Sequence, residues 1–213
     1  MKDLRRAFKW YAKAAEQGHS TAQCNLGWCY DEGKGVEQNK ATALKWFTKS
    51  AEQGHSEAQF SLGVCYDEGE GVEQNAAKAI EWYAKAAKQG HREAQCILGV
   101  CYFRGEGVEQ NKAKAVEWFT KAAEQEHSIG HPTAQFNLGD CYFHGKGVEQ
   151  NKAKAVEWYA KAAEQGYSEA QFSLGYCYDR GEGVEQSKAK AFEWFTKAAA
   201  QGENEAKLAL SRI

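Results

Sequence analysis

Proline is almost missing from this chain of 213 residues, since Pro132 is the only one. A proline inside a helix removes a backbone N–H and clashes with the preceding turn, so helical segments avoid it. The chain is rich instead in alanine, glutamate and lysine, which favour helices. The composition therefore predicts a largely helical protein.

Long apolar runs are missing as well. No stretch approaches the roughly 20 apolar residues that span a bilayer, so we expect no membrane insertion. The first residues, MKDLRRAFKWYAKAAEQG, carry charges throughout and lack the apolar core of a secretory signal. We expect either an intracellular protein in a reducing compartment or a fragment of a longer protein.

An excess of charge of one sign is also absent, because 27 Lys and Arg residues face 29 Asp and Glu residues, for a formal net charge of −2. This balance gives no electrostatic case for binding nucleic acid or an anionic membrane surface. The hydrolase motifs G-x-S-x-G and H-E-x-x-H do not occur. We therefore expect no enzyme, no catalytic residue and no cofactor.

The chain does contain a repeat. Four tryptophans follow one another at intervals of 36 residues, a fifth comes 40 residues later, and a sixth after 36 more: Trp10, Trp46, Trp82, Trp118, Trp158 and Trp194. Leu-Gly pairs keep the same intervals, beginning at Leu26-Gly27. A fixed period in this range is typical of a solenoid, in which each unit covers the apolar face of its neighbour.

The sequence of each unit predicts two helices, which we call helix A and helix B. In one unit, helix A begins at Ser20, GKGVEQ forms a turn, Asn39 caps helix B, and Gly54 follows its end. We predict an all-α protein, an α/α superhelical solenoid of antiparallel helix pairs with about twelve helices. A single repeat domain would span 1–213, with helix B of a partial repeat at 3–18, full repeats at 19–54, 55–90, 91–130, 131–166 and 167–202, and a partial C-terminal helix at 203–213.

The 40-residue interval contains four additional residues, Glu126–Ile129. Four residues make about one helical turn, so we expect helix B of that unit to grow by a turn. The alternative is a small bulged loop, with the helix ending near Gln125. Pro132 then opens the next helix, where proline is tolerated.

Seven cysteines are present, and five of them stand at one phase of the repeat, each just before a tyrosine. Equivalent cysteines on successive helices would lie about 8–10 Å apart. A disulfide tolerates a Cα separation of at most about 7 Å. We expect reduced, buried thiols that pack as small apolar groups.

The repeated letters resemble the Sel1-like repeat, a family related to the tetratricopeptide repeats. The resemblance rests on Ala22, Leu26-Gly27, Tyr30, the Gly33-x-Gly35-Val36 turn, Ala43, Trp46-Phe47, Ser50-Ala51 and Gly54, and it covers about residues 3–212. It implies a right-handed superhelix of helix pairs. It also implies a scaffold or adaptor for protein complexes without catalytic activity.

Other chemistry fits the repeat poorly. The five G-x-G-V turns lack the preceding strand and third glycine of a nucleotide-binding loop, so we interpret them as turns. Four histidines recur once per repeat and cannot form one site. His127 and His131 are four residues apart, but Gly130 lies between them and no third ligand is apparent. We expect no metal site.

Some positions of helix A vary between repeats. At about 100° per residue, Ala22, Leu26 and Tyr30 share one direction, and Trp28 and Asp31 share another with their neighbour Glu32. The resemblance to tetratricopeptide repeats places this second side on the concave face. Its occupants are the predicted partner-binding residues: Trp28, Asp31, Glu32, Asp67, Glu68, Phe103, Arg104, Asp140, Phe143, His144, Tyr176, Asp179 and Arg180. Neutral drift with partial burial is the alternative.

We expect this surface to bind a protein or peptide. Its early part is acidic, with Asp31, Glu32, Asp67 and Glu68, and its later part combines aromatic and cationic residues, with Phe103, Arg104, Phe143 and His144. This division predicts a bipolar partner segment. The alternative is a structural spacer within a larger multidomain protein.

Overall fold

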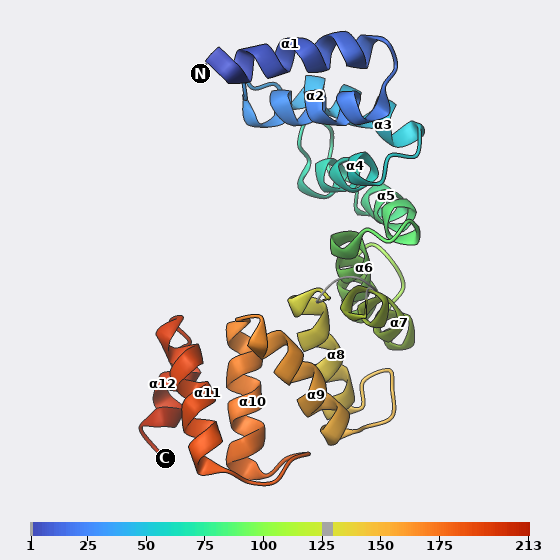
Figure 1. Cartoon of the computed structure of the whole chain (residues 1–213). Coiled ribbons are helices and arrows are strands. Elements are labelled where there is room, and N and C mark those ends of the chain that lie inside the picture. Colours follow the sequence, from blue (N-terminus) through green and yellow to red (C-terminus); the bar gives the residue numbers. More distant parts are fainter. Residues whose placement is uncertain (1, 125–129) are drawn as a thin grey trace. The chain divides into compact units, whose positions relative to one another are not determined.

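The computed structural model describes residues 2–124 and 130–213, and these residues form twelve α-helices and no strand (Figure 1). The predicted all-α solenoid of helix pairs is confirmed. The helices are α1 (Lys2–Glu16), α2 (Ser20–Glu32), α3 (Lys40–Glu52), α4 (Ser56–Glu68), α5 (Ala76–Lys88), α6 (Arg92–Arg104), α7 (Lys112–Ala123), α8 (Pro132–His144), α9 (Lys152–Glu164), α10 (Ser168–Arg180), α11 (Lys188–Ala200) and α12 (Asn204–Leu210).

The chain forms two compact units. The first unit contains Met1–Leu98 and Glu106–Glu109, and the second contains Gly99–Gly105 and Gln110–Ile213. In the first unit, α2 packs against α3 and α4 packs against α5; in the second, α8 packs against α9 and α10 against α11. Each of these pairs joins helix A to helix B of one repeat. Helix B also packs against helix A of the next repeat, as α3 does with α4 and α9 with α10.

Local capping explains where the helices begin and end. The side-chain oxygen of Asn39 accepts a hydrogen bond from the N–H of Thr42 at 2.8 Å, which satisfies a donor in the first turn of α3. The equivalent residues Asn75, Asn111, Asn151 and Ser187 cap their helices in the same way. Helix α2 ends at Gly33, whose φ of +70° favours glycine.

The Leu-Gly pairs mark the closest approach between helix A and helix B. A Cβ atom on Gly63 would lie 2.6 Å from the ring of Tyr83, which is 2% exposed. The same contact joins Gly27 to Phe47, Gly99 to Phe119, Gly139 to Tyr159 and Gly175 to Phe195. A side chain at any of these glycines would push the two helices apart, so the close packing explains the repeated glycine.

A buried glutamine also recurs in helix A, and the sequence analysis did not single it out. In the first unit, the Gln59 side-chain amide donates to the backbone carbonyl of Ala51 at 3.2 Å, and its oxygen accepts from the Gln89 amide at 2.7 Å. Ala51 belongs to α3, and Gln89 follows the end of α5. The glutamine therefore ties three successive helices together with hydrogen bonds inside the core.

The cysteines lie buried as free thiols, in agreement with the prediction. Burial raises the pKa of Cys24, Cys65, Cys96 and Cys177 to about 12 and the pKa of Cys141 to about 11. Desolvation disfavours the charged thiolate, which accounts for the direction. These thiols are core groups and not reactive nucleophiles.

The expected extra helical turn is wrong, because α7 ends at Ala123 and does not grow. The four additional residues 126–129 lie outside the described residues. Beyond them, the N–H of His131 donates to the carbonyl of Ala122 at 3.0 Å. His91 makes the equivalent bond to Ala86 at 3.2 Å, so the chain returns to the same point of the preceding helix in both repeats.

Candidate protein-binding surface

The predicted residues share one side of each A helix by their spacing, and we call this side of the A helices, taken in each unit by itself, the helix-A surface. Trp28, Asp31, Glu32, Asp67 and Glu68 belong to the first unit, on α2 and α4. The other eight belong to the second unit, on α6, α8 and α10. Seven of the thirteen are exposed and six are half-buried, and none lies fully in the core.

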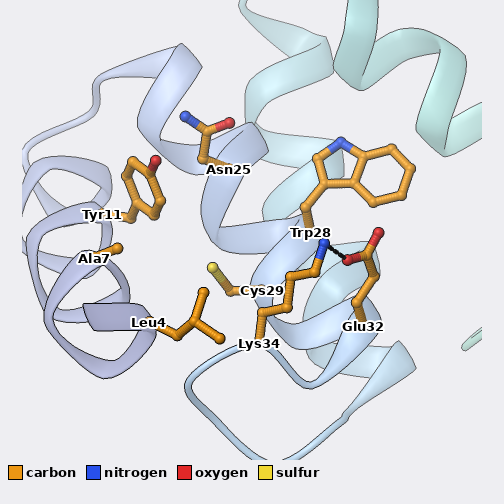
Figure 2. Close-up of a pocket in the computed structure, with 8 residues that line it drawn as sticks. All are labelled: Leu4, Ala7, Tyr11, Asn25, Trp28, Cys29, Glu32 and Lys34. Atoms are coloured by element: carbon orange, nitrogen blue, oxygen red, sulfur yellow. Dashed lines mark ion pairs between the residues drawn. The ribbon is translucent and has the colours of Figure 1, made fainter. Parts of the chain in front are cut away.

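Two predicted residues of the first unit line a hollow of about 300 Å³ beside α1 and α2 (Figure 2). Trp28 stands at its edge, with its ring against that of Phe47 at 5.5 Å between centroids. Glu32 forms an ion pair with Lys34. Ala7 and Tyr11 of α1 form the opposite wall.

One wall of this first hollow consists of residues at core positions of the repeat. Ala7 and Tyr11 occupy the repeat positions of Ala155 and Tyr159, which are 0% and 2% exposed. In the second unit, α8 covers those positions; in α1, both residues are half-buried. Because Ala7 and Tyr11 stand at core positions of the repeat, we do not take this hollow as a peptide site.

In the acidic part of the helix-A surface, two of the four predicted carboxylates, Asp31 and Glu32, form ion pairs with lysines. Lys40 lies 3.0 Å from an oxygen of Asp31 and 2.8 Å from one of Glu70, so one lysine bridges two carboxylates. The hydroxyl of Tyr83 donates to Asp67 at 3.4 Å. Glu32, Asp67 and Glu68 remain exposed.

The second unit brings four predicted residues into one hollow of about 280 Å³. Asp140, Phe143 and His144 come from α8, and Tyr176 comes from α10. Tyr159 of α9 and Phe172, Ser173 and Cys177 of α10 complete its lining. The hollow therefore lies between two neighbouring A helices and reaches helix B between them.

Asp140 is the one acidic residue of this lining. Its side-chain oxygen accepts a hydrogen bond from the Tyr159 hydroxyl at 2.6 Å. Burial, together with the charge of Asp140, raises the pKa of Tyr159 well above its ordinary value, so the phenol stays protonated and donates. Within the described residues, no lysine, arginine or histidine pairs with Asp140.

Aromatic rings surround this carboxyl group. The ring of Phe143 lies 6.3 Å from that of Tyr159 and 5.0 Å from that of His144. Phe172 packs on Phe195 at 5.6 Å, and Tyr176 is 40% exposed. The ammonium group of Lys152 lies 5.3 Å from the centroid of the Phe143 ring.

Asp179 and Arg180 lie further along α10 and face α12. Asp179 pairs with Lys188 at 2.6 Å and with Arg180 at 3.5 Å. Both residues line a second hollow of the same unit with Tyr176 and Leu208. Phe103 contacts Lys146, whose ammonium group is 5.8 Å from the ring centroid, and Arg104 is exposed.

Sequence reasoning missed the helix-B contribution to the hollow. Tyr159 stands in the Phe47 position, which we assigned to the core, and it is indeed buried apart from its hydroxyl contact. Phe172 occupies the helix-A position that holds Cys24, Phe60, Cys96 and Phe136 in the other repeats. The variation between cysteine and phenylalanine at this position was the available signal.

Comparison with known proteins decides the family. The Sel1 repeat matches the chain six times, at residues 1–19, 20–55, 56–91, 92–127, 132–167 and 168–203. The chain belongs to the Sel1 repeat family. Sel1 repeat proteins generally mediate protein–protein interactions, and the family is typically a non-catalytic scaffold.

Solved structures agree with this assignment. A protective antigen of uropathogenic Escherichia coli strains, which displays an SLR fold, is 41% identical with a TM-score of 0.92. The match covers 98% of this chain and 44% of that protein, so the chain spans less than half of the antigen's length. A Sel1 repeat protein from Oxalobacter formigenes is 35% identical with a TM-score of 0.89, over 99% of this chain and 82% of that one.

An immunity protein from Pseudomonas aeruginosa shares the fold at 23% identity, with a TM-score of 0.56 over 94% of this chain and 75% of that one. No curated protein matches the Sel1 repeat chain by sequence.

Metal and membrane sites are not apparent in the described part of the chain. Residues 2–124 and 130–213 hold no cluster of three or more metal-ligating side chains. No helix among them is both long and apolar enough to cross a membrane.

Proposed function

We propose that this Sel1 repeat chain is a non-catalytic adaptor that binds a segment of a partner protein on its helix-A surface. The observation that carries the proposal is the hollow between α8 and α10. It gathers Asp140, Phe143, His144 and Tyr176, which all stand at positions that vary between otherwise similar repeats.

The composition of the hollow supports protein binding. Aromatic residues in partly enclosed sites are common anchors of protein interfaces, because they bury a large apolar area with little loss of side-chain freedom. Tyr176 and the ring of Phe143 offer such area, and the polar groups of Asp140 and His144 can give direction.

The opposite surface suits a partner less well. On helix B, lysines cover the tryptophan rings: Lys121 lies 4.4 Å from the centroid of Trp118, and Lys161 lies 3.9 Å from that of Trp158. These contacts already occupy the aromatic faces with solvated cations. A partner would have to displace them before it could use the rings.

The bipolar partner stays a prediction. Its basic part would meet the exposed Glu32, Asp67 and Glu68 of the first unit, where carboxylates outnumber nearby lysines. We also propose a reducing compartment, on the grounds that the seven cysteines are buried free thiols.

A structural spacer is the second candidate. The relative from Escherichia coli is more than twice as long as the matched part, so a repeat array of this size can form a segment of a larger protein. A spacer would hold flanking parts at a fixed distance and would bind no partner in a saturable way.

Photo-crosslinking distinguishes the candidates. A benzophenone amino acid replaces Tyr176 on helix A or, as the matched control, Phe192 on helix B, since both are exposed in the second unit. We expect a discrete crosslinked polypeptide from position 176 and none from 192, and saturable binding once that polypeptide is purified. Crosslinking at neither position supports the spacer, and crosslinking at 192 alone contradicts the helix-A surface.

A further inference from the structure

The hollow between α8 and α10 contains a carboxylate, that of Asp140, at a position where the other repeats have an uncharged residue. The residues at the equivalent place in the other repeats are Trp28, Val64, Val100 and Tyr176, so Asp140 is the one acidic residue among them. Its neighbours in the hollow are the rings of Phe143, Tyr159, Phe172 and Tyr176. A carboxylate among aromatic rings is the combination that attracts an organic cation.

The hydrogen-bonding capacity of Asp140 is only partly used. A carboxylate accepts about four hydrogen bonds, and the Tyr159 hydroxyl supplies one. Asp31 and Asp179 stand one turn along in other repeats and pair with Lys40 and Lys188, but Asp140 pairs with no cation of the described chain. The hollow therefore has one negative charge that an incoming group can neutralise.

The rings are suited to a positive group as well. The ammonium group of Lys152 lies over the Phe143 ring, so one ring of this lining already contacts a cation. Two other positively charged or titratable groups lie nearby: Lys152 pairs with Glu182, and His144 is an exposed residue of the lining. The lining therefore combines the Asp140 carboxylate with several aromatic side chains and His144.

The size of the hollow limits what can enter. Sites for drug-sized molecules begin at about 300 Å³, and this hollow of about 280 Å³ is at or below that limit. One long side chain of a partner fits this space better than a folded surface. An acidic side chain would meet Asp140 with like charge, and a purely apolar one would leave that carboxylate facing it without a partner.

We propose that the hollow between α8 and α10 binds one basic side chain of the partner segment and prefers arginine to lysine. The guanidinium group stacks on aromatic faces, is weakly hydrated, and donates to a carboxylate along its edge. This proposal rests on the proposed function and names the residue that anchors it. It assigns a basic side chain to the part of the partner segment that meets this hollow, because Asp140 lines the hollow and pairs with no cation of the described chain.

Nuclear magnetic resonance of the full chain tests the proposal with N-acetyl-arginine methylamide as the probe. We expect saturable shifts of backbone signals in 139–144 and 172–177, with a Kd on the order of millimolar for so small a ligand. The citrulline analogue has the same shape without the charge and is expected to bind about tenfold more weakly.

Asp140→Asn is the decisive variant, since the amide keeps an oxygen for the Tyr159 hydroxyl. It is expected to weaken binding of the arginine probe about tenfold, whereas Glu157→Gln, at an exposed position of α9 outside the helix-A surface, leaves it unchanged. Equal binding of the citrulline analogue, an unaffected Asp140→Asn variant, or shifts confined to other residues would each overturn the proposal.

Failure of this proposal can be told apart from failure of the proposed function. If a partner crosslinks to position 176 and binds saturably, but the arginine probe and Asp140→Asn show no effect, the helix-A surface binds its partner without a basic anchor. If no partner binds at all, the proposed function fails, whatever the probe does.

Discussion

At the scale of single residues, the glycine of each Leu-Gly pair fixes the distance between helix A and helix B. Whether a Gly→Ala substitution at this position stabilises or destabilises the protein tests this role of the glycine. In an exposed helix, Gly→Ala stabilises by about 1 kcal/mol. At Gly63 the new methyl group would lie 2.6 Å from the buried Tyr83 ring, so we expect Gly63→Ala to destabilise the protein by about 1–3 kcal/mol instead. Chemical denaturation measures the change in the free energy of unfolding.

Removal of the ring is the control for that substitution. In the Tyr83→Ala background the methyl group has room, so the cost of Gly63→Ala should disappear in a double-mutant cycle. If Gly63→Ala stabilises the parent protein, the close approach is not what requires glycine.

The buried cysteines make a second prediction at the same scale. Folding raises the pKa of Cys177 from 9.0 to about 12, so above pH 9 the unfolded chain loses this proton before the folded chain does. The stabilising contribution of the thiol is complete below pH 9 and is lost as the pH rises toward 12. The difference in unfolding free energy between the parent and Cys177→Ala should therefore shrink over that interval.

Alkylation gives an independent readout of the same thiols. Iodoacetamide reacts with thiolates, so intact-mass spectrometry should show slow modification of the folded protein at neutral pH and rapid modification after denaturation. Reductant should leave the melting temperature unchanged, and a fall of many degrees would mean that a disulfide stabilises the fold.

At the scale of helices and loops, the repeat tolerates four additional residues because the chain returns to Ala122 after them. Deletion of Glu126–Ile129 restores the 36-residue interval and leaves the His131 donor and the Ala122 carbonyl in place. We expect a soluble protein with unchanged helicity and a melting temperature within a few degrees of the parent. Circular dichroism measures both. Unfolding of this variant would show that the four residues contribute packing.

The sequence predicted the helices well because their limits depend on local chemistry. Asn39 and its equivalents cap helix B as expected, and Gly33 ends helix A with a positive φ. The predicted length of α7 was wrong, because four additional residues are consistent with either a helical turn or a loop. The end of α7 at Ala123 excludes the extra turn, and residues 126–129 themselves lie outside the described residues.

The candidate site was predicted only in part, for a similar reason. Spacing on helix A identified Asp140, Phe143 and Tyr176, since they share one side of successive A helices. The same spacing could not show that the Tyr159 hydroxyl reaches Asp140 from helix B. Nor could it show that Lys40 bridges Asp31 and Glu70, because that contact joins residues from different repeats.

At the scale of the whole molecule, six Sel1 repeats give the chain the framework of an interaction scaffold. Because the repeats share their core residues, the differences between them lie on the surface. Aromatic side chains gather on the helix-A side of the second unit, and lysine-covered tryptophans occupy the helix-B side. The central claim is that the first of these two sides binds the partner.

Calorimetric titration of the crosslinked and purified partner tests this claim most directly, with two double variants of the second unit checked for helicity. Phe103→Ala with Tyr176→Ala removes aromatic area from helix A and should weaken binding about 30-fold, the loss typical of an anchor that contributes about 2 kcal/mol. Lys121→Ala with Lys161→Ala alters helix B and should change the Kd less than about threefold. If the lysine pair weakens binding as much as the aromatic pair or more, the partner binds the helix-B side and the account is wrong.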